Sequence, residues 1–385
     1  MMNVDILIQN GHVMDPSRNF EGEQDIGIFN GKIVDVSDKD NIKATKVINA
    51  AGCLIFPGLI DFHVHVFPKG SGVSVNPDYL LSTGVTSCVD AGTAGPVNFE
   101  AFYQTTIVPS QIRIKSYLNA WCAGQLDYGV QECFDLAHIS ERKLKRTIEK
   151  HRDNILGIKL RMSKGVALDP KTLDYGLKIA HSEGMHVNVH VSNPMMPLEE
   201  IVNVLGKDDI FCHIYQQIGN DSIFDQEGNI KSAYWKARER GVVFDAANGK
   251  MNFNLKTCQK AVSQGFWPDV ISSDWLEDKY NFSPYAKNLT FILQKYIEMG
   301  MPFMKALACV TSTPARLMKM EKKIGTLQPG AYGDVSIFKI VPKEAVHLDS
   351  AGTKFKTTSL FVPQMTICDG EIAFCQADFA IDNWA

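Results

Sequence analysis

Cysteine pairs, long apolar runs and a surplus of charge of either sign are all missing from this sequence. Its nine cysteines are odd in number and scattered, with no Cys-x-x-Cys motif, which favours reduced thiols over a disulfide framework. No run of about 18 apolar residues occurs, so no transmembrane helix is expected. The first residues carry neither a basic region nor a long apolar stretch, so no signal peptide is expected either. These absences predict a cytoplasmic protein.

The charge balance argues against polyanionic partners. Lys and Arg number 39 and Asp and Glu number 43, for a formal net charge of −4. Such a balance provides no electrostatic attraction toward nucleic acid or an anionic membrane. With 45% hydrophobic and 21% charged residues, the composition is that of an ordinary globular protein. We therefore expect no nucleic-acid partner and no membrane partner, and the sequence leaves a homo-oligomer open.

The middle of the chain, from Pro57 to about Met318, alternates short apolar runs with amphipathic stretches. Strands are expected at 59–66, 86–90, 112–118, 155–160, 186–191, 210–215, 242–246 and 270–273. Helices are expected at 141–152, 170–184, 198–205, 231–241, 255–265, 288–300 and 302–318. Eight β/α units over roughly 260 residues match the α/β class and the size of a (β/α)8 TIM barrel. The alternative, a doubly wound open sheet, would require a glycine-rich phosphate turn after its first strand, and none is present.

The two ends of the chain have a different texture, with short strands and tight turns. Asn10-Gly11 and Asn30-Gly31 separate apolar runs, and Asn-Gly is the strongest two-residue hairpin signal. Neither end is long enough for a comfortable core alone, so we expect both to form one small β-sandwich domain. The predicted boundaries are 1–56 for its first part, 57–320 for the barrel and 321–385 for its second part.

The most informative motif is the pair His63 and His65 at the end of an apolar run. Because a strand alternates its faces, both imidazoles project the same way, about 6.6 Å apart along the backbone. One metal ion can lie between side chains at that spacing, and the apolar run before them is typical of a strand buried on both faces. The motif is weak alone, so its weight depends on ligand-type residues at the ends of later strands.

Later strands supply such residues in order. Lys159 lies in the fourth expected strand, His190 ends the fifth, His213 lies in the sixth, and Asp274 follows the eighth. Active sites of (β/α)8 barrels form at the C-terminal ends of the strands, so these side chains are expected at one mouth. Imidazole suits zinc and neighbouring divalent metals, and a carboxylate completes a harder site.

This ordered set resembles the binuclear amidohydrolase superfamily, a group of metal-dependent hydrolases that includes deacetylases and dihydroorotases. Residues 54–61, Leu-Ile-Phe-Pro-Gly-Leu-Ile-Asp, resemble the family's entry into the first barrel strand. Residues 313–316, Thr-Pro-Ala-Arg, and residues 325–334 resemble its return to the β-sandwich. The resemblance covers nearly the whole chain, and six ligand positions in order with both flanks are far more specific than any single motif.

The resemblance implies two divalent metal ions, expected to be Zn²⁺. His63 and His65 would bind the more buried ion, and His190 and His213 the more exposed one. Two such ions bind a bridging hydroxide, polarise a carbonyl and stabilise the oxyanion that forms when the carbonyl is attacked. The resemblance therefore predicts a hydrolase that acts on a small-molecule substrate.

The resemblance also gives roles to Lys159 and Asp274. Lys159 would be N6-carboxylated by CO2 and bridge both ions as a carbamate. Desolvation inside a barrel lowers the pKa of a lysine, so a neutral amine is available for that reaction. Asp274 would ligate the buried ion and act as the catalytic proton shuttle, taking the proton of the hydroxide and returning it to the leaving group.

Within the superfamily, the residues favour hydrolysis of an acyl-amide or acyl-ester bond in a small carboxylate-bearing substrate. Dihydroorotase-like members typically carry an arginine two residues after the second histidine, where this sequence has Phe67. Mononuclear deaminases lack the bridging lysine, which is present here as Lys159. Residues 157–161 and 90–93 look most like deacetylase-type amidohydrolases. The alternative is a cyclic amidohydrolase, dihydroorotase-like or hydantoinase-like.

Three further residues are candidate substrate contacts. Arg161 has the inward parity of the bridging lysine, so it could bind a substrate carboxylate through two hydrogen bonds, and a salt bridge to a loop acid is an equal alternative. Tyr128 could donate to the oxyanion, as a tyrosine does in related dipeptidases, and Asn248 ends the seventh strand. His186 is expected in the core, with Asp61 as a hydrogen-bonding support. The remaining histidines, at positions 12, 138, 151, 181 and 347, are expected at the surface.

Overall fold

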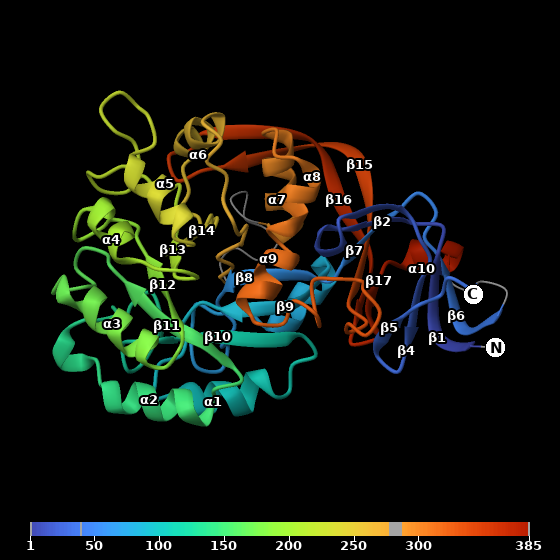
Figure 1. Cartoon of the computed structure of the whole chain (residues 1–385), viewed down its shortest axis with the longest axis horizontal. Coiled ribbons are helices and arrows are strands. Elements are labelled where there is room, and N and C mark those ends of the chain that lie inside the picture. The colour runs from blue at the N-terminus through green and yellow to red at the C-terminus, as the bar shows by residue number, and fades with distance from the viewer. Residues whose placement is uncertain (1, 39–40, 277–286, 384–385) are drawn as a thin grey trace.

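Three sheets organise the chain, and a parallel sheet from its middle is the largest of them (Figure 1). The structure is a computed structural model that describes residues 2–38, 41–276 and 287–383. The parallel strands lie side by side in chain order, as successive β/α units do. They are β8 (Leu59–Val64), β9 (Val85–Asp90), β10 (Arg113–Asn119), β11 (Ile155–Arg161), β12 (His186–His190), β13 (Ile210–Cys212) and β14 (Val243–Asp245).

The two edge strands of the parallel sheet, β8 and β14, are joined through segment 270–275. On one side the backbone nitrogen of Ala246 donates to the carbonyl of Val270 at 3.0 Å. On the other side the nitrogen of Asp274 donates to the carbonyl of His63 at 2.8 Å. The sheet is therefore a TIM-like half-barrel of parallel strands whose open side is bridged by this segment. The strand expected at 270–273 is reduced to isolated bridges at Val270 and Trp275.

Helices follow most of the parallel strands and lie on the outside of the sheet (Figure 1). They are α1 (Phe99–Phe102), α2 (Glu141–Lys150), α3 (Lys171–Ser182), α4 (Leu198–Val204), α5 (Ser232–Glu239), α6 (Leu255–Ser263), α7 (Leu289–Glu298), α8 (Phe303–Ala308) and α9 (Ser312–Leu317). Helix α10 (Ala377–Asn383), at the chain end, packs instead with the end sheets, where Phe379 joins their hydrophobic cluster. Short helical turns occur at Pro16–Arg18, Pro77–Thr83, Tyr103–Ile107 and Leu136–His138.

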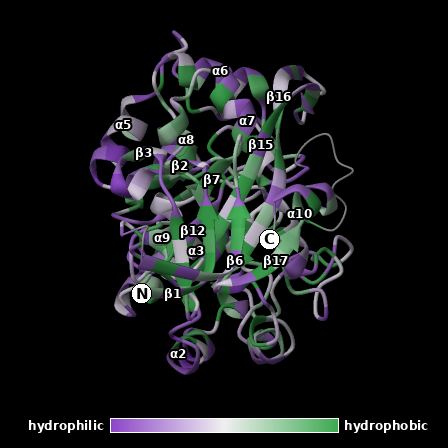
Figure 2. Cartoon of the chain, turned by 90° about the vertical axis from the view of Figure 1, so that its right-hand side faces the viewer, coloured by the Kyte–Doolittle hydropathy of each residue, from purple (hydrophilic) through white to green (hydrophobic). Residues whose placement is uncertain are grey.

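Helix α2 illustrates how the sequence sets these elements. Ser140 caps its N-terminus by accepting a hydrogen bond from the backbone nitrogen of Lys143 at 3.4 Å. Leu144 and Ile148, one turn apart, are fully buried, whereas most of the other residues are charged. Figure 2 accordingly shows α2 as mainly hydrophilic, while the strands at the centre of that view are hydrophobic.

The prediction of one helix at 302–318 is wrong, because this segment forms two helices, α8 and α9. Pro314 lies in the first turn of α9. A continuous helix would need a backbone N–H at this position to donate one turn back, and proline has none. The other amphipathic stretches form the expected helices within two residues at each end.

Both ends of the chain contribute to the remaining two sheets. The N-terminal sheet has the order β5 (Lys32–Val34), β4 (Ile26–Phe29), β1 (Met2–Gln9) and β6 (Ile42–Asn49). The sheet that combines both ends has the order β17 (Glu371–Cys375), β16 (Lys354–Cys368), β15 (Val335–Leu348), β7 (Leu54–Pro57), β2 (His12–Asp15) and β3 (Phe20–Glu23). One hydrophobic cluster contains Ile8 and Ile28 of the first sheet together with Ile55 and Ile337 of the second.

Of the two expected Asn-Gly hairpins, one is confirmed and one is wrong. Asn30-Gly31 joins β4 to β5, which pair antiparallel. Asn10-Gly11 joins β1 to β2, which belong to different sheets. Asn10 does adopt the left-handed conformation typical of such turns, with φ 63°. Local turn chemistry thus predicted the reversal of the chain but not the partner of the strand that follows.

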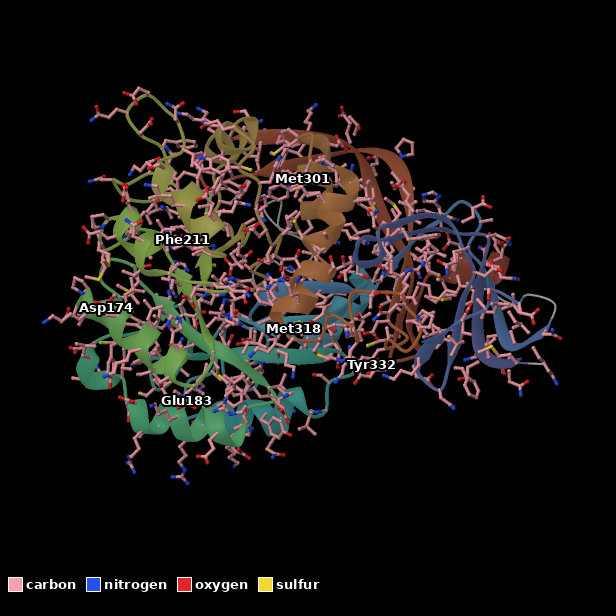
Figure 3. All side chains as sticks on the ribbon, in the orientation of Figure 1. Asp174, Glu183, Phe211, Met301, Met318 and Tyr332 are labelled. Atoms are coloured by element: carbon pink, nitrogen blue, oxygen red, sulfur yellow. The ribbon has the colours of Figure 1, made fainter. Side chains whose placement is uncertain are left out.

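The sheet that combines both ends contacts the parallel sheet along one side of the molecule. Tyr332, labelled in Figure 3, lies between them, with the guanidinium carbon of Arg113 from β10 4.3 Å from its ring centroid. Arg113 also donates to Asp334 at 2.7 Å. The long β15–β16 hairpin reaches as far as α6, and Asp349 at its tip accepts a hydrogen bond from the nitrogen of Leu255, the first residue of α6.

Two histidines expected at the surface are buried instead. His151 is 6% exposed, and its Nε2 lies 2.8 Å from Glu100. His347 is 1% exposed and stacks on Phe291 with ring centroids 3.8 Å apart. Both residues lie where two elements pack together, and such long-range packing leaves no periodic signal in the local sequence.

Candidate metal centre

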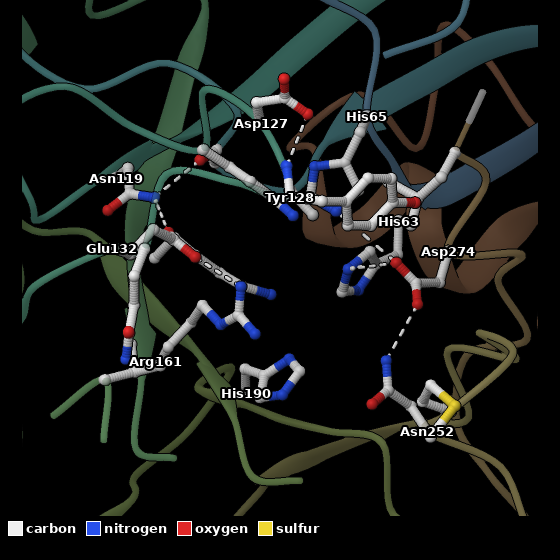
Figure 4. A pocket seen from close by; sticks show the side chains of 18 of the residues that line it. His63, His65, Asn119, Asp127, Tyr128, Glu132, Arg161, His190, Asn252 and Asp274 are labelled. Carbon is white, nitrogen blue, oxygen red and sulfur yellow. Dashed lines mark hydrogen bonds and ion pairs between the residues drawn. The ribbon is translucent and has the colours of Figure 1, made fainter. Parts of the chain in front are cut away.

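His63 lies on β8, His65 follows the end of that strand, and a third candidate ligand lies in the bridging segment 270–275. The Nε2 atoms of His63 and His65 lie 3.6 and 3.5 Å from Oδ1 of Asp274 (Figure 4). All three side chains are buried. Their ligand atoms lie within 4.8 Å of one another, so a single cation between them could contact all three.

Hydrogen-bond partners behind the two imidazoles set their orientation. Nδ1 of His65 lies 2.8 Å from the hydroxyl of Thr93, which in turn donates to Asp90 at 2.7 Å. Nδ1 of His63 lies 3.3 Å from Oδ2 of Asp245. An Nδ1 that donates to these oxygens leaves Nε2 with a free lone pair, which is the state a metal-binding histidine needs.

His190 and His213 lie beside this group. Their ring centroids are 4.4 Å apart, and the His213 ring is 5.3 Å from that of His63. Nδ1 of His213 donates to the carbonyl of Ala247 at 3.0 Å. Its Nε2 is buried and has no hydrogen-bond partner among the described residues. A buried, unpaired imidazole nitrogen is costly unless a ligand completes it.

Two of the candidate ligands have an unusual backbone conformation. His213 has φ 66° and Asp274 has φ 49°. Residues with a Cβ rarely occupy this left-handed region, at a cost on the order of 1 kcal/mol each, and such residues cluster at functional sites. Both residues therefore depart from regular strand geometry at the candidate site.

Burial favours the neutral imidazole in His63, His190 and His213. It lowers the pKa of His63 and His190 well below the usual range, and it lowers the pKa of His213 to about 3. Desolvation is the main cause in each case, since an imidazolium loses more hydration than an imidazole. A neutral imidazole is the form that binds a divalent metal.

Lys159 shares a cavity of about 570 Å³ with His63, His65, His190 and Asp274. The lysine is 3% exposed, and its Nζ donates to Oδ1 of Asn188 at 2.8 Å. Lys159 is therefore buried and not exposed to solvent, which agrees with the prediction from its place in an apolar strand. Together with the unpaired Nε2 of His213, this set of nitrogen and oxygen donors fits divalent cations well.

Arg161 and Tyr128 also line this cavity (Figure 4). Arg161 forms a salt bridge with Glu132, an acid in the loop after β10, and Glu132 also accepts from the side-chain nitrogen of Asn119 at 2.7 Å. The salt bridge from Arg161 to a loop acid, which was the alternative to binding a substrate carboxylate, is therefore present in this structure. Tyr128 is 63% exposed at the rim.

The expectation that Asn248 contacts the substrate is not met by its position in the structure. Its side chain is 1% exposed and does not line the cavity, because it bonds to Ser272, Lys295 and Tyr296. The preceding residue, Ala247, has φ 35°, so the alternation expected of a strand ends before Asn248. Asn248 therefore turns away from the cavity.

Sequence reasoning missed several polar residues that complete the site. Asp245 ends β14 and could have been found by the strand-end rule used for the ligands. Cys212 places its Sγ 3.2 Å from Nδ1 of His63, and no sequence signal predicted this. Glu132 lies in an irregular loop, where side-chain direction cannot be read from periodicity. By contrast His186, expected in the core, is 7% exposed, and Asp61 accepts a hydrogen bond from the nitrogen of Ser273 at 3.0 Å, as expected of a support.

Comparison with known proteins identifies the class. The sequence profile described as the amidohydrolase family matches residues 54–373. A deacetylase of Agrobacterium fabrum is 30% identical over 348 residues, covering 89% of this chain and 84% of the relative. A crystal structure of an adenine deaminase superimposes with a TM-score of 0.87 at 28% identity, covering 97% of this chain and 100% of that one. A crystal structure of a dihydroorotase does so with a TM-score of 0.84 at 27% identity, covering 96% and 98%.

The fold and the site thus define a metal-dependent hydrolase that acts on C–N bonds, and the chain belongs to the amidohydrolase family. Among the described residues, no helix is long and apolar enough to cross a membrane.

Proposed function

We propose that this enzyme is a binuclear deacetylase-type amidohydrolase that cleaves an acyl-amide or acyl-ester bond of a small carboxylate-bearing substrate. The observation that carries the proposal is the convergence of His63, His65, Lys159, His190 and Asp274 on one cavity, with the unpaired His213 Nε2 beside them. The similarity to a deacetylase over most of both chains supports the reaction type.

In this proposal His63, His65 and Asp274 would hold one divalent ion, His190 and His213 would hold the other, and an N6-carboxylated Lys159 would be a ligand of both. When bound, two such cations, of which Zn²⁺ best suits this donor set, supply Lewis acidity and a water of lowered pKa. Carboxylation would join the nitrogen of Lys159 to the carbon of CO2 with release of its protons, and the resulting carbamate would place a negative charge in the cavity.

Asp274 moves the proton in the proposed reaction. Its Oδ2 accepts a hydrogen bond from Asn252 at 3.1 Å, and its Oδ1 faces the Nε2 atoms of His63 and His65. The carboxylate takes the proton of the attacking water and delivers it to the leaving amine or alkoxide. We propose Asp274 as the catalytic residue and Tyr128 as a donor to the oxyanion from the cavity rim.

Arg161 is the proposed partner of the substrate carboxylate. Its guanidinium lines the cavity, and its buried Nε has no hydrogen-bond partner among the described residues. Glu132 occupies one edge of the guanidinium, so a substrate carboxylate would bind through the remaining N–H groups.

Arg161→Met should raise KM for an acidic substrate far more than it lowers kcat, because the lost contact serves binding. The measurement is steady-state kinetics on matched N-acetyl substrates with a free and an amidated carboxylate. Arg142→Met on exposed α2 is the control and should change neither constant. An unchanged KM would dismiss the role of Arg161, and equal activity on both substrates would dismiss the substrate class.

The second candidate function is hydrolysis of a cyclic amide, which the similarity to a dihydroorotase structure favours. An assay panel of N-acetyl amino acids, acetylated hydroxy acids, dihydroorotate and hydantoins separates the two functions. We expect turnover on the first two groups, and turnover confined to the cyclic amides would establish the alternative.

We further propose a closed (β/α)8 barrel at 57–320 and one β-sandwich built from 1–56 and 321–385. The shared hydrophobic cluster of the two end sheets and the backbone bonds that join β8 and β14 through 270–275 support this division. We also propose a cytoplasmic location, since all nine cysteines are unpaired.

A further inference from the structure

Helix α7 carries a lysine that the proposed reaction does not use. Lys295 is 1% exposed, and its Nζ donates to Oδ1 of Asn248 at 2.7 Å. The same nitrogen lies 3.6 Å from the centroid of the Phe253 ring. Desolvation is the largest effect on this group and lowers the pKa of Lys295 to about 7.

Burial of a lysine on a helix face costs free energy, because the ammonium group loses its hydration. The neighbouring buried positions of α7 include Ile292 and Leu293, which pack without a polar group, and Tyr296, whose uncharged hydroxyl donates to the same Asn248 oxygen at 3.3 Å. An unbranched apolar side chain of similar length would avoid the desolvation cost at position 295. The hydrogen bond from Lys295 to Asn248 is therefore the feature that distinguishes this lysine from an apolar side chain.

Asn248 anchors a turn that lies between two proposed ligands. Its backbone nitrogen and its side-chain nitrogen both donate to the carbonyl of Ser272, at 3.0 and 3.2 Å. The carbonyl of the preceding residue, Ala247, accepts the hydrogen bond from Nδ1 of His213. On the other side, a Cβ added at Gly249 would lie 1.8 Å from Oδ2 of Asp274, so this backbone packs directly against that carboxylate.

The turn therefore sets two properties of the site. Because the Ala247 carbonyl can only accept, Nδ1 of His213 must carry the proton and Nε2 must keep its lone pair. Because Gly249 abuts Asp274, a shift of the turn would move the carboxylate or release it. Lys295 holds the middle residue of this turn by donating a hydrogen bond from α7 to the amide oxygen of Asn248.

We propose that Lys295 is a positioning residue for the metal centre, acting through Asn248 to hold the 247–249 turn against His213 and Asp274. The inference rests on the proposed binuclear function. It assigns a task to a helix that contributes no ligand and no cavity-lining residue within the described part of the chain.

The test compares two substitutions that separate packing from positioning. Lys295→Met keeps the length and apolar volume but cannot donate, whereas Lys295→Gln keeps an N–H donor on a shorter side chain. We expect Zn²⁺ affinity, measured by competition with a chromogenic chelator, to fall roughly 10–100-fold in Lys295→Met, as for other residues that orient ligands. Lys295→Gln should recover part of this loss. Lys256→Met on the exposed face of α6 is the matched control and should bind Zn²⁺ like the wild type.

A double-mutant cycle with Asn248→Ala tests the route of the effect. If Lys295 acts through Asn248, the double variant should lose no more Zn²⁺ affinity than Asn248→Ala alone. Additive losses, a wild-type affinity in Lys295→Met, or a better affinity in Lys295→Met than in Lys295→Gln would each overturn the inference. A wild-type protein that binds no Zn²⁺ would instead overturn the proposed function, so the two failures are distinguishable.

Discussion

Lys159→Ala is expected to lose both metal ions and all measurable hydrolysis. Lys159 is the only proposed ligand shared by both ions. Its replacement would remove the negative charge that offsets the repulsion between the two cations. Elemental analysis of the purified variant, together with assays on N-acetyl amino acids, measures both losses. Lys164→Ala, which removes an exposed lysine three residues after β11, is the matched control and should keep metal and activity.

Rescue by small molecules makes this prediction more specific. Acetate or another short carboxylic acid can occupy the space left by the Lys159 side chain and restore a bridging carboxylate. We therefore expect partial recovery of metal and turnover when such acids are added to Lys159→Ala. A variant that keeps both metals without added acid would contradict the bridging role, as would an unmodified Lys159 amine in a metal-loaded crystal.

Asp274→Asn is expected to keep much of its metal and lose most of its turnover. The asparagine retains one oxygen near His63 and His65 but cannot accept the proton of the attacking water. Removal of a general acid–base group typically costs roughly 10²–10⁴-fold in rate. Single-turnover or steady-state kinetics on metal-analysed protein measures the effect, with Asp174→Asn on the exposed face of α3 as control.

A near-wild-type rate for Asp274→Asn would remove this residue from the chemistry and leave it as a ligand only. Loss of metal in parallel with rate would mean that the substitution disrupts the site, and the proton role would then rest on the residual rate per bound metal. Measurement of both quantities on the same preparation separates these effects.

The fold and the proposed ligands were predictable because they follow from local rules. Strand alternation and the strand-end location of barrel active sites brought His63, Lys159 and His190 to one cavity from sequence alone. Each of these residues lies within a regular strand in the structure, where parity determines the direction of its side chain.

The rule fails where the backbone leaves the strand. Ala247 has φ 35°, which turns Asn248 into the protein and away from the cavity. A salt bridge from Arg161 to a loop acid was one of the two expectations, but Glu132 could not be identified as that acid because it lies in an irregular loop. The strands on either side of Asn10-Gly11 were expected to pair as a hairpin but lie in different sheets, because local turn chemistry does not specify long-range pairing.

The most direct test of the proposed metal centre is its metal content. Protein expressed with added zinc and freed of loose metal should contain two equivalents of divalent metal per chain, measured by inductively coupled plasma mass spectrometry against an amino-acid-based protein concentration. Removal by chelator should abolish hydrolysis, and two equivalents of Zn²⁺ should restore it. One equivalent or none in metal-replete, active protein would contradict the account.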